Sequence, residues 1–162
     1  MSFTIIACIG KNRELGKDND LVFHFKEDMR FFRESTSGHT VVMGYNTWLS
    51  IGSRALPNRK NIVISFNEVE LPEGVEQIHN LNEYAEANRD SNEEIFIIGG
   101  GSIYKAFLPY ANKLLLTEVD ASIEGATVYF PEFDPTDFNK ETIAQLKEDN
   151  TQFSINKYTR RV

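Results

Sequence analysis

Two glycine-containing turns have residue types and spacing that could bind a phosphate-containing ligand. An apolar run over residues 95–98 ends in three glycines at 99–101, and a segment of helical spacing follows. Such glycines let a ligand approach the backbone, and the free N–H groups at a helix start favour phosphate. A second apolar run, 40–43, ends at Gly44. Together the turns indicate a diphosphate site, although a triple glycine alone is as often a plain turn between a strand and a helix.

Asp28 is the single acidic residue whose position is most informative. It follows Phe25 by three residues and precedes Phe32 by four, so at helical spacing it flanks an apolar stripe. A carboxylate that faces a core is unfavourable unless it is paired, and no basic residue shares its face at this spacing. The pattern alone favours a surface or helix-capping acid. The alternative is a carboxylate that binds an amidine-like ligand edge through two parallel N–H donors.

Length, charge and cysteine content limit the class of protein. A chain of 162 residues is the size of one domain, and its formal net charge of −7 argues against a protein that coats nucleic acid or an anionic membrane. The cluster of Arg54, Arg59 and Lys60 could still bind a small anion. The one cysteine, Cys8, fits a buried reduced thiol, and the three histidines lack metal-ligand spacing, so no metal is expected. Because no apolar run could span a bilayer and no long exposed apolar stripe is evident, we expect a cytoplasmic monomer.

Apolar, β-rich runs alternate with segments of helical spacing, which is typical of an α/β domain with a largely parallel sheet. The expected strands are Phe3–Ile9, 40–43, 61–65, 94–98 and 113–119. The expected helices are 26–35, a short one after Gly44, 81–89 with Asn80 as its cap, and 102–108. After an expected solvated loop over 132–141, residues 141–147 and 152–160 are predicted as an antiparallel hairpin. The predicted fold has three layers, with a mostly parallel central sheet closed by this C-terminal hairpin and flanked by about four helices.

Several motifs, taken in chain order, resemble those of bacterial dihydrofolate reductases. Each motif alone is weak, but their order and spacing hold over nearly the whole chain and together they are highly specific. They are Ile6-Ala7, Leu15-Gly16-Lys17-Asp18-Asn19, Glu27-Asp28-Met29 with Phe32, Val42-Met43-Gly44 with Thr47-Trp48, Ser50-Ile51-Gly52, Leu56-Pro57-Asn58-Arg59-Lys60-Asn61, Ile97-Ile98-Gly99-Gly100-Gly101 with Tyr104, and Leu116-Thr117 before Glu124-Gly125. The resemblance implies the dihydrofolate-reductase-like fold in a single domain, 1–162, with an adenosine-binding subdomain at roughly 39–90.

The resemblance also implies a substrate site for dihydrofolate. Asp28 would hold the 2-amino group and a ring N–H of the pterin, and Thr117 would support that contact. Arg59 would bind the α-carboxylate of the glutamate tail as a bidentate pair. The apolar walls of the site would be Ile6, Ala7, Met29, Phe32, Ile51 and Leu56.

The implied cofactor is NADPH, with its diphosphate along the two glycine turns and the Gly99–Gly100 peptide in the cis form. Tyr104 and Ile98 would lie beside the nicotinamide, and the loop around 19–23 would close over it. The implied cofactor-binding residues are Ala7, Leu15, Asn19, Leu21, Gly44, Tyr45, Asn46, Thr47, Ser65, Phe66, Ile98, Gly99, Gly100, Gly101, Ser102, Ile103 and Tyr104.

The implied reaction passes a hydride from NADPH to C6 of 7,8-dihydrofolate while N5 takes a proton, which gives 5,6,7,8-tetrahydrofolate for one-carbon metabolism. Asp28 would orient and polarise the pterin, and water would protonate N5 after loop closure. The residues implied for catalysis are Asp28, Thr117, Tyr104 and Phe23. Antifolate inhibitors are expected to bind the same site.

The sequence departs from the family pattern at several cofactor positions. Tyr45 stands where the family usually has Arg, and Ser102 stands where a basic residue often follows the triple glycine. Phe66 replaces a small hydroxyl residue after Ser65. These positions often hold the 2′-phosphate of NADPH, and loss of guanidinium groups weakens phosphate binding. We therefore hypothesise a reduced preference for NADPH, so that NADH could also serve.

The loop over the active site departs as well. Leu21-Val22-Phe23 replaces the usual Leu-Pro-Trp, so Phe23 lacks the indole N–H that helps to fix a water. Lys26 replaces a proline before the acid, and Ala126 stands where an acid that anchors the closed loop is common. These changes predict a less ordered loop.

Two other functions are kept open. The pyrimidine reductase of riboflavin synthesis has a similar cofactor site, but Asp28 and Arg59 suit a pterin with a glutamate tail. A non-catalytic pteridine- or nucleotide-binding paralogue would explain the altered cofactor positions, but it would not require Asp28, Thr117 and Tyr104 to be kept together.

Overall fold

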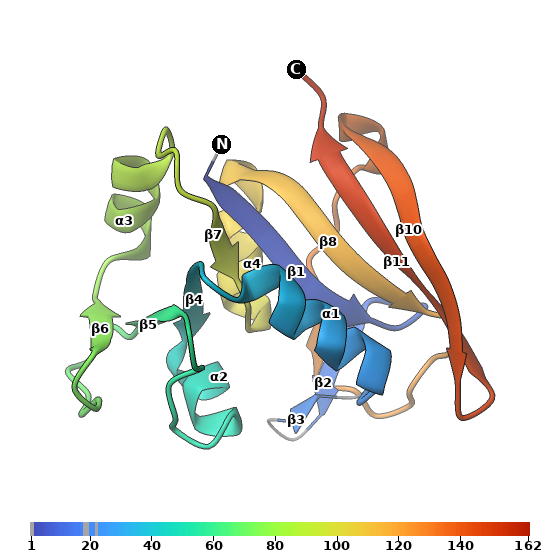
Figure 1. Cartoon of the computed structure of the whole chain (residues 1–162), viewed down its shortest axis with the longest axis horizontal. Coiled ribbons are helices and arrows are strands. Elements are labelled where there is room, and N and C mark those ends of the chain that lie inside the picture. Colours follow the sequence, from blue (N-terminus) through green and yellow to red (C-terminus); the bar gives the residue numbers. More distant parts are fainter. Residues whose placement is uncertain (1, 18–19, 22) are drawn as a thin grey trace.

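The structure, a computed structural model that describes residues 2–17, 20–21 and 23–162, is built on an eight-stranded sheet (Figure 1). Its strands are β1 (Phe3–Ile9), β4 (Thr40–Gly44), β5 (Lys60–Ile64), β6 (Val75–Ile78), β7 (Ile95–Ile97), β8 (Ala111–Val119), β10 (Phe138–Glu148) and β11 (Thr151–Arg160). Their order is β10-β11-β8-β1-β7-β4-β5-β6. The strands from β8 to β6 run parallel, and β11 and β10 close one edge antiparallel. The predicted mostly parallel sheet with a C-terminal hairpin is confirmed.

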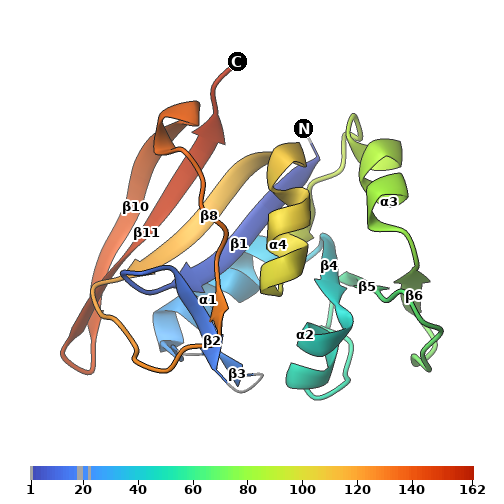
Figure 2. The same ribbon diagram turned by 180° about the vertical axis from the view of Figure 1, so that it is seen from behind.

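The α-helices are α1 (Lys26–Thr36), α2 (Tyr45–Ser50), α3 (Leu81–Asn88) and α4 (Gly101–Phe107). Figures 1 and 2 show α1 on one face of the sheet and α4 on the other. Successive side chains of β1 divide between these faces. Ile5 packs in a core cluster with Phe107 of α4, whereas Ile6 packs in a second cluster with Trp48 of α2. Because both faces are covered, most residues of the strand are apolar, and the buried Thr4 hydroxyl donates to the Glu94 carboxylate.

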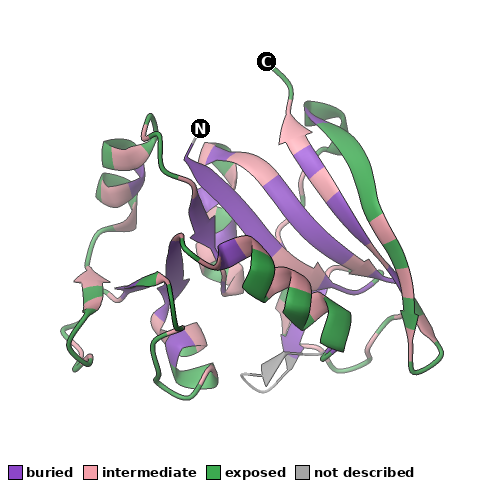
Figure 3. Cartoon of the chain, viewed as in Figure 1, coloured by how far each residue is buried: buried purple, intermediate pink, exposed green. Residues whose placement is uncertain are grey.

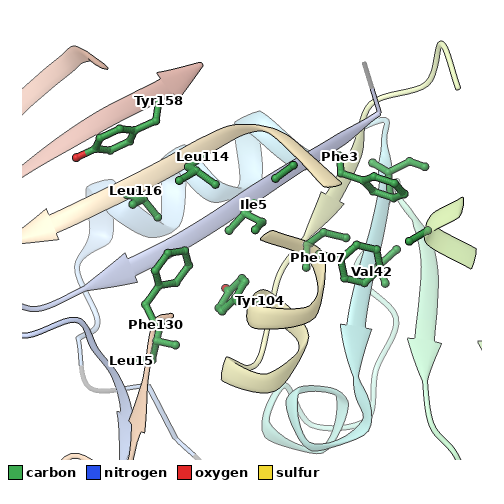
Figure 4. Close-up of a cluster of buried hydrophobic side chains, with 14 of the residues drawn as sticks. Phe3, Ile5, Leu15, Val42, Tyr104, Phe107, Leu114, Leu116, Phe130 and Tyr158 are labelled. Atoms are coloured by element: carbon green, nitrogen blue, oxygen red, sulfur yellow. The ribbon is translucent and has the colours of Figure 1, made fainter. Parts of the chain in front are cut away.

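The central strands form the buried core of the molecule, and β10 is the exposed edge (Figure 3). Figure 4 shows the larger core cluster, in which Tyr104 and Phe107 of α4 face β1 and β8. The Tyr104 ring packs against Phe130, with ring centroids 5.2 Å apart. The helix that follows the triple glycine is therefore anchored in the core. None of the helices in the described residues is both long and apolar enough to span a membrane.

Some elements differ from the predictions. A second sheet, ordered β3-β2-β9, and strand β6 were not predicted; the strands of this small sheet are β2 (Glu14–Lys17), β3 (Asp20–Leu21) and β9 (Val128–Tyr129). The solvated loop predicted over 132–141 is wrong in its second half, where a 3₁₀ turn, Pro135–Asp137, leads into β10. Phe138 causes the difference, because it is buried against Phe133 and Tyr158 and so starts the strand early.

Candidate active site

The Asp28 carboxylate is the centre of the candidate site, and α1 places it there. Asp28 lies in the first turn of α1, and the Thr117 hydroxyl of β8 donates a hydrogen bond of 2.5 Å to its Oδ1. Phe25, just before the helix, stacks on Phe153 of β11 with ring centroids 4.5 Å apart. This stack fixes the helix start against the sheet. Thr117, which was expected to support the contact of Asp28 with the pterin, thus bonds directly to the Asp28 carboxylate.

Cys8 lies beside the same carboxylate. In the sheet register Cys8 is the partner of Thr117, so both side chains point to the face that α1 covers. Burial raises the pKa of Asp28, and hydrogen bonds from Thr117 and from the Cys8 thiol offset that rise only in part. Burial also raises the pKa of the Cys8 thiol, which the Asp28 charge raises further. Cys8 thus lies beside Asp28 as a protonated thiol, a placement that the sequence analysis missed.

Four of the predicted apolar wall residues belong to one cluster. Ile6, Phe32, Ile51 and Leu56 pack in or against one apolar cluster, which has Trp48 at its buried side. The Met29 side chain, adjacent to Asp28 in α1, is 56% exposed and offers apolar surface to a ligand. Ala7 is half-buried against the other core cluster.

Arg59 lies at the opposite end of α1 from Asp28. Its Nη1 donates to Thr36 Oγ1 and its Nε donates to the Pro57 carbonyl, both at 2.9 Å. Burial and the positive charge of Arg33 lower the pKa of Arg59, but a guanidinium stays charged at neutral pH. Thr36 follows Asp28 by eight residues, a rise of about 12 Å along a helix. An elongated ligand along α1 could therefore contact Asp28 at one end and these cations at the other.

The two glycine turns meet at the carboxyl ends of β4 and β7. The Gly44 N–H donates to the Gly99 carbonyl at 2.9 Å, and the Gly99–Gly100 peptide is cis, as expected. A Cβ on Gly99, whose φ is +134°, would lie 3.1 Å from the Thr47 hydroxyl and 3.6 Å from that of Tyr104. The absence of a side chain at Gly99 therefore leaves room for the Thr47 and Tyr104 side chains to pack against this backbone.

Tyr104 is fixed by its hydroxyl. The buried hydroxyl donates to the Ile6 carbonyl of β1 at 2.7 Å, and burial raises the pKa of Tyr104, so the group stays protonated. Tyr104 thus joins the triple-glycine helix to the strand that carries Ile6 and Ala7. The side chain orients these backbones and has no proton to release at neutral pH.

Glu14 of β2 fixes the turn that follows β1. Its two carboxylate oxygens accept the N–H groups of Asn12 at 2.7 Å and Ile123 at 2.8 Å. The predicted residue Leu15 is buried near Gly101, and Phe23 is buried in a cluster with Phe25 and against Cys8. The predictions for Asn19 and Val22 lie outside the described residues, as does the Leu21 side chain.

The remaining predicted cofactor residues lie around the glycine turns and along β5. Tyr45 and Ile98 pack against the Trp48 cluster, and Ile103 approaches Gly44 closely. Asn46, Ser102 and Phe66 are exposed, the last by 89%. The Ser65 hydroxyl donates to the Asn67 carbonyl at 2.8 Å. These side chains surround the turns without forming a cluster of cations.

Comparison with known proteins identifies the relatives of this chain. Residues 2–160 match the family model described as dihydrofolate reductase. The dihydrofolate reductase of Buchnera aphidicola subsp. Acyrthosiphon pisum is 39% identical over 158 residues, which is 98% of this chain and 94% of that protein. The Bacillus subtilis enzyme is 37% identical over 90% of this chain and 85% of its own. A solved structure of Enterococcus faecalis dihydrofolate reductase complexed with NADP(H) and RAB-propyl is similar over 99% of this chain and 97% of that one, with a TM-score of 0.85 and 27% identity.

Proposed function

The chain belongs to the dihydrofolate reductase family, and from that premise we propose which of its residues perform the reaction. The enzyme reduces 7,8-dihydrofolate to 5,6,7,8-tetrahydrofolate with NADPH. The observation that carries the assignment to this site is the half-buried Asp28 carboxylate, held at 2.5 Å by Thr117 and open to a ligand beside Met29. The relatives support neither a riboflavin-pathway pyrimidine reductase nor a non-catalytic paralogue.

Asp28 binds and orients the pterin. Its carboxylate accepts the 2-amino group and the adjacent ring N–H, a forked donor pair that two oxygens can satisfy at once. The Thr117 hydroxyl, which donates to Oδ1, fixes the carboxylate plane before the ligand arrives. Binding therefore needs little rearrangement of the protein.

The neighbouring side chains exclude water and hold the tail. Ile6, Phe32 and Ile51 line the flat ring system, and Met29 covers it from α1. Arg59 binds the glutamate α-carboxylate, with its guanidinium steadied by Thr36 and Pro57. Because Asp28 and Arg59 lie at the two ends of α1, the helix sets the distance between the two contacts.

The glycine turns fit NADPH, which when bound supplies the hydride for C6 of the pterin. Gly99, Gly100 and Gly101 bring backbone close to the diphosphate, with the Thr47 hydroxyl as a hydrogen-bond partner. Tyr104 holds the turn to β1 and remains protonated, so it supplies no proton to N5. Water protonates N5, while Asp28 polarises the ring.

Further points belong to the same proposal. The segment 39–90 binds the adenosine half of NADPH through Tyr45, Ser65 and Phe66, and NADH serves as a weaker substitute. Antifolates occupy the pterin site, and the enzyme is a cytoplasmic monomer.

Loss of reduced-nicotinamide absorbance with dihydrofolate tests the proposal. Asp28→Asn should lower kcat/KM by about a hundredfold, because it removes a charged acceptor from two hydrogen bonds. Glu27→Gln, an exposed acid in the same helical turn, is the matched control and should keep the parent rate. Unchanged turnover in Asp28→Asn would contradict the assigned role, and a folded parent without turnover would contradict the function.

A further inference from the structure

The first turn of α1, which carries Asp28, is capped by a residue from the other end of the chain. Phe25 occupies the N-cap position, where a phenyl ring cannot satisfy the free N–H groups of a helix start. The Glu148 carboxylate at the end of β10 accepts the N–H of Lys26 at 2.8 Å and that of Glu27 at 3.3 Å. The cap therefore comes from a residue 122 positions away from Lys26.

The hairpin that carries Glu148 is itself well positioned. Glu148 pairs with Thr151, and the two residues between them, Asp149 and Asn150, have φ values of +50° and +62°. Positive φ at both positions is typical of the tight two-residue turn that matches the twist of a hairpin. Behind this turn, Phe153 stacks on Phe25, so the hairpin and the helix start are packed together. The position of the cap is thus set by the tight hairpin turn and by the packing of Phe153 on Phe25.

We propose that Glu148 is a positioning residue for the reductase reaction, because its cap holds the first turn of α1 where Asp28 meets Thr117 and the pterin. The inference rests on the proposed function, since it assigns Glu148 a role in how Asp28 binds dihydrofolate. Without the cap, the two N–H groups lose their acceptor and the turn frays. No hydrogen bond or ion pair among the described residues joins this turn to the cofactor residues on α2 and α4. The loss should therefore fall on dihydrofolate and spare NADPH.

Glu148 also acts on Asp28 through its charge. Among the residues that the structure describes, the titratable side chains of other elements that interact with Asp28 are Cys8 of β1, Tyr104 of α4 and Glu148 of β10. Burial is the main cause of the raised pKa of Asp28; the Cys8 thiol lowers the pKa, and the negative Glu148 raises it. Removal of the Glu148 charge should therefore make Asp28 easier to ionise. The two effects of Glu148 can be separated. The helix cap requires only an oxygen that accepts hydrogen bonds, whereas the effect on the pKa of Asp28 requires a negative charge.

Three variants make this separation. Glu148→Ala removes oxygen and charge, whereas Glu148→Gln keeps one acceptor oxygen without the charge. The control is Glu141→Ala, an exposed acid of the same strand whose side chain makes no hydrogen bond or ion pair among the described residues. The measurements are the KM values for dihydrofolate and for NADPH, and the titration of the Asp28 carboxyl by ¹³C NMR in the unliganded protein.

Glu148→Ala should raise the KM for dihydrofolate about fivefold, the size expected for a lost helix cap, and leave the KM for NADPH unchanged. Glu148→Gln should stay within about twofold of the parent, since one acceptor oxygen remains and the second N–H, in a long and exposed hydrogen bond, can bond to water instead. In both variants the Asp28 titration should move to lower pH, and Glu141→Ala should match the parent in every measurement.

Other results would overturn the inference. If the parent turns over and Glu148→Ala matches Glu141→Ala in KM and in the Asp28 titration, Glu148 has no such role and the proposed function stands. Equal rises in both KM values with a lower melting temperature would mean general loss of structure, which also overturns it. A parent without turnover would contradict the proposed function, while the titration would still test the coupling between Glu148 and Asp28.

Discussion

Burial raises the pKa of Asp28 above its ordinary value, and the hydrogen bonds of Thr117 and Cys8 offset only part of that rise. In the unfolded chain the same carboxyl is hydrated and has its ordinary pKa. Between these two values the folded protein binds more protons than the unfolded one, so stability falls as the pH rises through that window. Above it the ionised carboxylate remains unfavourable for folding. A ligand that donates hydrogen bonds to the ionised Asp28 carboxylate would account for a charge in this unfavourable position.

Asp28→Asn should therefore raise the melting temperature at neutral pH while it lowers activity. The amide removes the buried charge, and a gain of about 1 kcal/mol corresponds to roughly 2–4 °C in a chain of this size. The gain should vanish below the ordinary pKa of the carboxyl, where Asp28 is protonated in both states. Thermal unfolding from pH 3 to pH 8 checks this, with exposed Glu27→Gln as control. An unchanged or lower melting temperature at neutral pH would contradict the account.

Tyr45 bears on the choice of cofactor. It leaves the adenosine side without a guanidinium at this position, and its ring packs against the Trp48 cluster. Tyr45→Arg should raise the ratio of kcat/KM for NADPH to that for NADH by about tenfold, since a charge-assisted pair forms with the 2′-phosphate alone. Tyr45→Leu, which adds no charge, should keep the parent ratio. A parent that already strongly prefers NADPH would argue against the weakened preference.

At the scale of elements, Glu14 joins the loop before β2 to the segment before β9. Burial acts to raise its pKa, but the N–H groups of Ile123 and Asn12 lower it, and the net pKa lies below the ordinary value. A depressed carboxyl pKa stabilises the fold above the unfolded-state pKa, and the stabilisation is lost as the pH falls through the folded-state pKa. Glu14 of β2 thus provides a carboxylate that holds the Asn12 and Ile123 segments together. The less ordered loop expected from Ala126 stays a prediction.

Glu14→Gln should lower the free energy of unfolding at neutral pH by about 1–3 kcal/mol, because an amide cannot accept both N–H groups and leaves one unsatisfied. The difference from the parent should shrink in acid, where Glu14 is protonated. Urea unfolding at pH 7 and pH 3 measures both values. Glu124→Gln changes an exposed acid near Ile123 and serves as control. Equal stability of parent and variant at pH 7 would show that the anchor is unimportant.

The elements that could be predicted are those whose sequence signal is local. β1 and α3 carry their own patterns, and the predicted Asn80 cap of α3 does accept the Glu83 N–H at 3.0 Å. β2 has no such pattern, because Glu14–Lys17 is charged and contains glycine. It is a strand through distant partners, such as the Thr127 N–H that donates to the Gly16 carbonyl. Strand formation of this kind depends on tertiary context.

The same division holds for the site. The glycine turns were predicted from their own local pattern, and the role of Asp28 was predicted from family motifs in the sequence. Cys8 was assigned to the core, because its place beside Asp28 follows from the register with Thr117. The Glu148 cap was not predicted, because no sequence pattern near Glu148 indicates that it contacts α1. Contacts between distant segments are the part that one sequence leaves open.

At the scale of the whole molecule, the candidate site joins segments that lie far apart in the chain. Asp28 and Thr117 are 89 positions apart, and Tyr104 and Ile6 are 98 apart. The segment 39–90 shares this framework, because β4 is hydrogen-bonded to β7 and Trp48 packs with Ile6 in one core cluster. A separate subdomain would need a core of its own. We therefore expect the adenosine-binding segment to unfold together with the rest.

Trp48 makes this expectation measurable, since it is the only tryptophan and lies within 39–90 at 2% exposure. Its fluorescence and the far-ultraviolet circular dichroism of the whole chain should change at the same urea concentration. NADP⁺ at about a hundredfold excess over its Kd should move both transitions upward together, by about 2.7 kcal/mol of unfolding free energy, because it binds the folded state alone. An earlier Trp48 transition, with the circular dichroism still native, would mean that the segment 39–90 opens by itself. The cofactor would then stabilise only that transition, and the two halves of the site would be independent rather than parts of one cooperative unit.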